Sequence, residues 1–274
     1  MVKIMKVYAP CYYKNFKCIA DKCVNNCCIG WEIDIDEETL DFYKKSKDIS
    51  NKISTVSSPH FILESNGRCP FLNKQNLCEI INKYGDEHLC QICRDHPRFY
   101  NFYDSRAEYG LGLVCEAATK LILESDFSLE IIGEDDFNET ENTFESEFFH
   151  EREILFSKEP YSLKEYIPDI PLHILANYFS KLERLDTKWD DYLLTLKGRT
   201  ESLRNIEIKN SKQWKNLFCY FLYRHFYNTS FEFCLLCTNL IFAIEGDISE
   251  VCRMFSGEIE YSDENIEKVL RFID

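Results

Sequence analysis

The sequence predicts a mainly α protein in which a loop-rich, cysteine-rich metal domain is followed by a C-terminal helical bundle. Two observations support this fold class. Eight of the 14 cysteines lie between residues 18 and 93, among residues that favour turns. The C-terminal part instead repeats apolar residues at helical spacing and shows no alternating strand pattern of similar length. We therefore expect a metal domain over residues 1–123, an acidic connecting segment over residues 124–169 and a helical domain over residues 170–274.

The eight N-terminal cysteines form two groups with the spacings C-x4-C-x3-C-C and C-x8-C-x11-C-x2-C. Asn, Asp, Gly and Pro residues surround both groups, and loops of this composition let the backbone wrap several sulfurs around one centre. Four thiolates suffice for one centre, so either two centres form or one forms with thiols to spare. The candidate metal ligands are Cys18, Cys23, Cys27, Cys28, Cys69, Cys78, Cys90 and Cys93.

Disulfides are the competing explanation for so many cysteines, and the cellular compartment decides between the two. Charged residues and a proline interrupt the apolar N-terminus, which therefore resembles neither a signal peptide nor a membrane span. We expect a cytoplasmic protein without a membrane partner. Because the cytosol is reducing, metal ligation is favoured over disulfide bonding.

The metal itself is less clearly indicated by the spacing. Structural zinc usually uses tight C-x2-4-C pairs, and Cys90 and Cys93 form the one x2 pair of the second group. Uneven spacing favours an iron-sulfur cluster, most simply a 4Fe-4S cluster, with zinc as the alternative. A radical S-adenosylmethionine motif, C-x3-C-x2-C, is not present, because Gly30 stands where its third cysteine would be.

Three segments of the chain resemble the flagellin lysine-N-methylases, a family with a cysteine-rich zinc- or iron-chelating domain. They are YAPCYYKNFKCIADKCVNNCCIGWEIDID, GRCPFLNKQNLCEIINKYGDEHLCQICRDHPR and LGLVCEAATKL, and KLERLDTKWDDYL and QWKNLFCYFLYRHFYN resemble the C-terminal hallmarks of that family. The resemblance implies methyl transfer from S-adenosylmethionine to surface lysines of flagellin by an enzyme with an iron-sulfur cluster. It also makes Cys115, in the third segment, a possible ninth ligand.

The resemblance has two departures. His96 stands in CRDHPR where the family has an aromatic residue, and many relatives are longer in the C-terminal half. A second function class therefore stays open beside the methyltransferase, namely a non-catalytic zinc- or iron-binding module that senses or handles metal. No Gly-rich dinucleotide fingerprint follows a strand, so we assign neither catalytic residues nor a donor pocket.

Acidic residues dominate the predicted connecting segment. The chain has a net charge of −15, and residues 124–169 hold fifteen acidic and three basic side chains. Phenylalanines are interspersed with these acids, which predicts partial helix with an acidic outer face rather than a disordered linker. A surface this negative argues against nucleic acid as a partner, and a solvated face is favoured over a docking surface for lysines.

Helical stripes organise the C-terminal part. We expect Asp36 to cap an N-terminal helix and Ser262 to cap the last one. His225 is interpreted as a packed or surface residue rather than a ligand, and the scattered thiols as small apolar packing residues. The expected stripes are Leu172, Leu175, Ala176, Phe179, Leu182 and Leu185; Trp214, Leu217, Phe218, Phe221, Leu222 and His225; and Ile266, Val269, Leu270 and Ile273; the packing thiols are Cys219, Cys234, Cys237 and Cys252.

Overall fold

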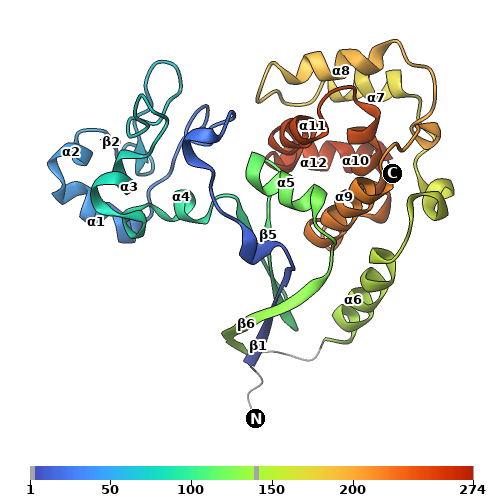
Figure 1. The fold of residues 1–274 in the computed structure, drawn as a ribbon, viewed down its shortest axis with the longest axis horizontal. Helices are drawn as coiled ribbons and strands as arrows, with labels where there is room; N and C mark the ends of the chain where they lie inside the picture. The colour runs from blue at the N-terminus through green and yellow to red at the C-terminus, as the bar shows by residue number, and fades with distance from the viewer. Residues whose placement is uncertain (1–3, 139–141, 274) are drawn as a thin grey trace. The chain divides into compact units, whose positions relative to one another are not determined.

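A computed structural model describes residues 4–138 and 142–273, and it confirms a mainly α fold (Figure 1). The chain divides into two compact units. The cysteine-rich unit comprises Lys17–Phe99. The larger unit comprises the described residues up to Phe16 and those from Tyr100 onward. None of the described helices is both long and apolar enough to cross a lipid bilayer.

Short elements joined by turns build the cysteine-rich unit. Asp36 caps its first helix as predicted, because its carboxylate accepts the backbone N–H of Thr39 at 3.0 Å. The core of the unit is formed by apolar side chains such as Tyr43 and Phe61, packed together with Cys69 and Cys90. The elements are η2 (Ala20–Lys22), α1 (Glu37–Lys45), α2 (Lys47–Ser50), β2 (Ile53–Ser54), β3 (His60–Phe61), α3 (Glu79–Tyr84), η3 (Asp86–His88) and α4 (Gln91–Asp95).

A four-stranded sheet, which the sequence did not predict, is formed by β1 (Ile4–Pro10), β4 (Arg98–Phe102), β5 (Arg106–Leu111) and β6 (Leu129–Asn138), in the order β4-β5-β1-β6. Strand β1 runs parallel to β5 and antiparallel to β6, so Val7 pairs with Ala107 on one side and Gly133 on the other. Figure 1 shows β6 lying beside β1. Met5, Val7 and Ala107 are buried together on one face.

Helices complete the larger unit, and α10 packs against α9, while α5 packs against α9 and α11. The predicted stripe from Trp214 to Leu222 is fully buried, and Ser262 caps the last helix by accepting the Asn265 N–H at 3.2 Å. The elements are η1 (Tyr13–Asn15), α5 (Glu116–Glu124), α6 (Thr143–Phe156), η4 (Pro160–Tyr166), α7 (Leu172–Phe179), α8 (Trp189–Lys197), η5 (Leu203–Asn205), α9 (Ser211–Arg224), α10 (Phe231–Ala243), α11 (Ile248–Phe255), the π-helical turn η6 (Ser256–Glu260) and α12 (Asp263–Ile273).

The structure departs from the expected stripes and divisions at particular places. Leu185 is 53% exposed, because α7 ends at Phe179 and the helical spacing no longer applies beyond it. The chain is divided differently from the expected 1–123, 124–169 and 170–274. Strand β1 pairs with strands far along the chain, which places β1 in the larger unit. The acidic segment contributes β6 and α6 to that unit, and Phe149 and Arg152 of α6 are buried.

Candidate metal centre

Six of the eight candidate ligands gather in the core of the cysteine-rich unit. Cys69 and Cys90 are buried members of that core, and Cys28, Cys78 and Cys93 pack against it. Cys27 joins them through a hydrogen bond with the Cys28 side chain. We call this group the six-cysteine cluster: Cys27, Cys28, Cys69, Cys78, Cys90 and Cys93.

Turns and helix starts position these thiols. Cys78 is the N-cap residue of α3 and Cys90 that of α4, so Cys93 lies one turn further along α4. The backbone N–H of Cys69 donates to the carbonyl of Cys28 at 2.8 Å, which joins the two sequence groups. The backbone thus brings together sulfurs that are more than sixty residues apart in sequence, from Cys27 to Cys93.

Two glycines permit the close approach of the two groups. The N–H of Gly30 donates to the carbonyl of Gly67 at 2.9 Å. Gly30 has a φ of +95° and Gly67 a φ of +77°, a left-handed conformation that glycine adopts without the penalty of a side chain. A Cβ atom on Gly67 would lie 3.5 Å from the backbone nitrogen of Gly30. Gly30, which interrupts the radical motif, therefore has a structural role where the two groups meet.

The thiols form two hydrogen-bonded pairs. Cys28 donates to the Cys27 sulfur, and this hydrogen bond, together with the smaller effect of His96, lowers the pKa of Cys27 to about 4 against the opposing effect of burial. The same bond raises the pKa of Cys28. Cys93 likewise lowers the pKa of Cys90, while its own pKa is raised. Each pair therefore holds one thiolate readily, and thiolate is the form that binds metals.

Backbone N–H groups act on the sulfurs of Cys69 and Cys78. Burial raises the pKa of Cys69 to about 11, but the N–H of Phe71 and the amine of Lys52 act in the opposite direction. Burial also raises the pKa of Cys78, against the N–H groups of Ile80 and Ile81. N–H groups facing sulfur are the surroundings in which thiolate-ligated clusters are found.

Within residues 4–138 and 142–273, no three His, Cys, Asp or Glu side chains converge as the ligands of a metal ion would. Four of the six sulfurs are instead arranged as two hydrogen-bonded pairs, Cys27 with Cys28 and Cys90 with Cys93. The donor set itself fits a thiolate-ligated metal or iron-sulfur cluster, because six thiols from separate segments share one core.

The other cysteines lie elsewhere. Cys18 is exposed and accepts the N–H of Ala20 at 3.4 Å, and the Cys23 thiol donates to the carbonyl of Asn25 at 3.3 Å. Cys115 is the N-cap residue of α5 in the larger unit. The four scattered thiols are buried in the larger unit, in agreement with a packing role: Cys219, Cys234, Cys237 and Cys252.

Tyr43 and His96 are residues near the thiols that the sequence did not single out as functional. The Tyr43 hydroxyl donates to the carbonyl of His88 at 2.7 Å, and burial, followed by the charges of Cys90 and Cys93, raises its pKa. One of sixteen tyrosines gives no signal of its own in a sequence. His96 did carry a signal, because it stands in CRDHPR where an aromatic residue was expected.

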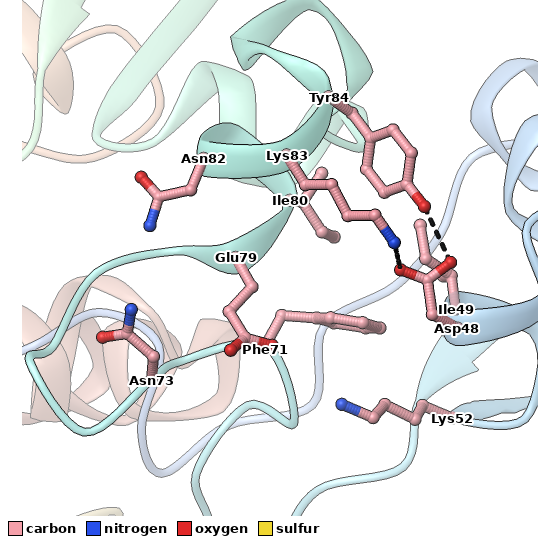
Figure 2. A pocket seen from close by; sticks show the side chains of 10 residues that line it. All are labelled: Asp48, Ile49, Lys52, Phe71, Asn73, Glu79, Ile80, Asn82, Lys83 and Tyr84. Atoms are coloured by element: carbon pink, nitrogen blue, oxygen red, sulfur yellow. Dashed lines mark hydrogen bonds and ion pairs between the residues drawn. The ribbon is translucent and has the colours of Figure 1, made fainter.

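A pocket of about 430 Å³ shares Phe71 and Ile80 with the core that holds the cluster. Figure 2 shows Lys83 and Tyr84 pointing toward the carboxylate of Asp48. The Lys52 amine lies 4.5 Å from the centre of the Phe71 ring and donates to the Pro70 carbonyl at 2.8 Å. Both amines are thus engaged by the protein itself.

The fold and the thiol cluster define a class: mainly α proteins that carry a self-contained cysteine-rich unit. Particular relatives follow from comparison with known proteins. The chain is 28% identical to the Lysine-N-methylases of Salmonella choleraesuis (strain SC-B67) and Salmonella typhimurium (strain LT2), over 156 residues, 52% of this chain and 38% of each relative. It is 29% identical to the Flagellar biosynthetic protein FliU of Salmonella muenchen over 136 residues, 44% of this chain and 79% of FliU.

These relatives confirm the resemblance to the lysine-N-methylases that the motifs predicted. The matched part of the chain spans 38% of the length of the Lysine-N-methylases. No protein-family model and no solved structure matches the chain.

Proposed function

We propose that this protein transfers methyl groups from S-adenosylmethionine to lysine side chains of flagellin. The observation that supports the proposal is the similarity to two proteins named Lysine-N-methylase over half of this chain. The similarity to a protein named for flagellar biosynthesis supports flagellin as the substrate. Cytoplasmic localisation is part of the proposal, because none of the 14 cysteines forms a disulfide and reduced thiols persist in a reducing compartment.

The reaction requires a neutral lysine, because an ammonium group has no lone pair to attack a methyl group. With an ordinary pKa near 10.4, the neutral amine at pH 7 lies about 4.6 kcal/mol uphill, at about 1.36 kcal/mol per pKa unit. A catalytic site lowers this cost by desolvating the amine or by placing a base beside it.

We infer that thiols of the six-cysteine cluster hold a metal centre, by preference a 4Fe-4S cluster, with zinc as the alternative. The inference is supported by the two thiol pairs, by the N–H groups that face Cys69 and Cys78, and by the burial of Cys69 and Cys90. When bound, such a centre crosslinks the loops and contributes folding free energy to the cysteine-rich unit. Cys18, Cys23 and Cys115 stay candidate ligands.

Methyl transfer can be tested directly on protein purified without oxygen. Incubation with flagellin and S-adenosylmethionine carrying a labelled methyl group is expected to label flagellin, with the label on lysine after peptide mapping. Flagellin whose lysines have been acetylated is the control, and it should stay unlabelled. If flagellin takes up no label from protein whose metal centre is intact, the proposed activity is wrong.

A non-catalytic metal-binding module is the second candidate function. It is favoured by the 38% coverage of the Lysine-N-methylases and by the compact cysteine-rich unit, which has a core of its own. Under this alternative, metal content follows the metal supply of the cells, and methyl transfer is absent at every metal loading. Metal and acid-labile sulfide analysis of protein from iron-rich and zinc-rich cultures distinguishes the two.

A further inference from the structure

A second pocket, of about 510 Å³, lies in the larger unit, where β1 and β5 meet the first turns of α6. Its wall includes Lys6 and Tyr8 of β1, Arg106 of β5, and Ser146 and Phe149 of α6. All of these residues belong to the same compact unit. The pocket is rich in groups that attract anions, although it borders the most acidic segment of the chain.

Arg106 is the most unusual residue of this pocket, because it carries a charge and yet is only 7% exposed. The carbon at the centre of its guanidinium lies 3.4 Å from the centre of the Phe149 ring and 4.9 Å from that of Tyr8. The two rings pack on the flat face of the guanidinium, so its N–H groups can make hydrogen bonds only at its edge.

The edge of this guanidinium lacks hydrogen bonds. Within the described part of the chain, Nε and Nη2 of Arg106 are buried and have no hydrogen-bond partner. Oε1 of Glu108 lies 2.6 Å from Nη2, but the contact is one of charge and not an aligned hydrogen bond. Buried donors without partners are costly, and they often mark the place of a missing ligand.

Glu108 cannot fully neutralise Arg106, because it also binds Arg152. The Arg152 guanidinium is fully buried and donates to both carboxylate oxygens of Glu108. Two buried cations therefore share one carboxylate. Glu145, a buried acid on α6, is already bound by the backbone N–H groups of Asp104 and Ser105 at 3.0 and 2.9 Å. An anion in the pocket would balance the remaining positive charge.

The start of α6 adds to the attraction for an anion. This helix has 14 residues, and Asn142 caps it by accepting the N–H of Glu145 at 3.2 Å. The N-terminus of a helix carries partial positive charge, and Thr143 and Ser146 place hydroxyl groups from its first turns on the pocket wall. Glu153, further along the same helix, supplies one negative group at the wall.

We propose that this pocket binds the α-amino acid group of the methyl donor, with its carboxylate at Arg106. The assignment to S-adenosylmethionine rests on the proposed function. The carboxylate meets the guanidinium edge and the start of α6, and the α-ammonium group is matched by the carboxylate of Glu153. This makes Arg106 a ligand-binding residue and assigns the donor site to the larger unit, whereas the six-cysteine cluster belongs to the cysteine-rich unit.

Calorimetry with two nucleosides tests the proposal on the full chain. S-adenosylhomocysteine carries the amino acid group, whereas 5′-methylthioadenosine lacks it. We expect Arg106→Gln to weaken S-adenosylhomocysteine binding by about 10- to 100-fold, the range for a lost hydrogen bond to a charged group. Binding of 5′-methylthioadenosine should stay unchanged.

A second variant tests the pocket without replacing a buried residue, because a loss of binding in Arg106→Gln can also result from misfolding. Ser146→Phe fills the pocket from an exposed position on α6 and should also weaken S-adenosylhomocysteine binding. Ser157→Phe, at the C-terminal end of the same helix and outside the pocket, is the matched control and should bind as the wild type does. Circular dichroism confirms that each variant is folded.

Several outcomes would overturn the assignment. One is S-adenosylhomocysteine binding that is unaffected by Arg106→Gln and Ser146→Phe, and another is a wild type that does not bind this nucleoside. A pocket that binds inorganic phosphate in an Arg106-dependent way, but no S-adenosylhomocysteine, is an anion site of another kind. Methyl transfer to flagellin that persists in any of these cases leaves the proposed function intact, so the two can fail separately.

Discussion

Nε2 of His225 donates a hydrogen bond to Oε1 of Glu260 at a distance of 2.6 Å, inside the larger unit. The Tyr220 hydroxyl donates to the same oxygen at 2.8 Å, and Nη1 of Arg224 lies 3.4 Å from it. One carboxylate of the π-helical turn η6 thus organises three side chains of α9 and its C-cap. This confirms that His225 is a packed residue.

Replacing Glu260 by Gln should destabilise the larger unit by about 3–5 kcal/mol, the usual cost of breaking a buried ion pair. The substitution removes the charge that faces Arg224 while keeping the size of the side chain. Urea unfolding followed by tryptophan fluorescence measures the loss at pH 7, because Trp189 and Trp214 are buried in this unit. Glu267→Gln is the control, since its pair with Arg271 is largely exposed and should contribute less than about 1 kcal/mol. Equal losses in both variants would contradict this account.

The Glu260 cluster also predicts how stability depends on pH. Burial raises the pKa of Glu260, but the charge of Arg224 and the hydrogen bond from His225 outweigh burial and lower it from 4.5 to about 2. The stability that the carboxylate contributes is therefore present above pH 4.5 and is lost as the pH falls toward 2. At about 1.36 kcal/mol per pKa unit, the shift corresponds to about 3 kcal/mol.

His225 acts in the same direction over a higher range of pH. Burial lowers its pKa below 6.5, so the folded state holds it neutral and loses stability as the pH falls below 6.5.

The contribution of Glu260 is measured by comparing the wild type with Glu260→Gln. Their unfolding free energies, measured from pH 7 to pH 2, should converge below pH 4.5. A gap at pH 2.5 as wide as that at pH 7 would show that the carboxylate is not the titrating group.

Asp36 links the start of α1 to the thiol-bearing helix α4. Its Oδ1 accepts the N–H of Thr39 at 3.0 Å, and its Oδ2 accepts the N–H of Gln91 at 2.6 Å. Asp36→Ala should cost about 1–2 kcal/mol, as the loss of a helix cap does. It should also speed the labelling of Cys90, which is buried and directly precedes Gln91.

Mass spectrometry of pulse-alkylated protein measures this labelling for each thiol. Asp36→Asn retains one side-chain oxygen as an acceptor and should restore most of the protection. Glu37→Ala, in the exposed first turn of the same helix, should leave the labelling of Cys90 unchanged. Protection of Cys90 that survives Asp36→Ala would mean that the link to Gln91 has no role in holding α4.

The helices could be predicted from the sequence where apolar residues at helical spacing indicate which side chains are buried. The stripe from Trp214 to Leu222 and the cap at Ser262 follow local rules of spacing and capping, and the structure agrees with both. The sheet could not be predicted in this way. Strand β1 is buried through pairing with β5 and β6, which lie far along the chain, so nothing within its seven residues indicates its partners.

Composition and spacing predicted eight thiol ligands, and their role as ligands stays a prediction. The structure brings six of the eight into one core. Pairing of Cys27 with Cys28 was not foreseen, because neighbouring side chains usually point apart. The pocket at Arg106 was not foreseen either. Arg106 is distinguished by its own burial beside the buried carboxylate of Glu108, which also binds Arg152, and a sequence does not reveal that burial.

Cys90→Ser should abolish metal binding if the six-cysteine cluster holds the centre, because Cys90 is fully buried in its core and paired with Cys93. The variant should also lose protection of residues 17–99 against proteolysis, since a thiolate-ligated centre supplies folding free energy to a loop-rich unit. Metal analysis and limited proteolysis measure the two effects.

Two control variants accompany Cys90→Ser. Cys18→Ser replaces an exposed thiol and should keep both metal and protection. Cys219→Ser, a buried thiol of the larger unit, separates a general packing defect from loss of a ligand. Full metal content in Cys90→Ser would exclude Cys90 as a ligand, and loss of metal in Cys18→Ser would extend the ligand set beyond the cluster.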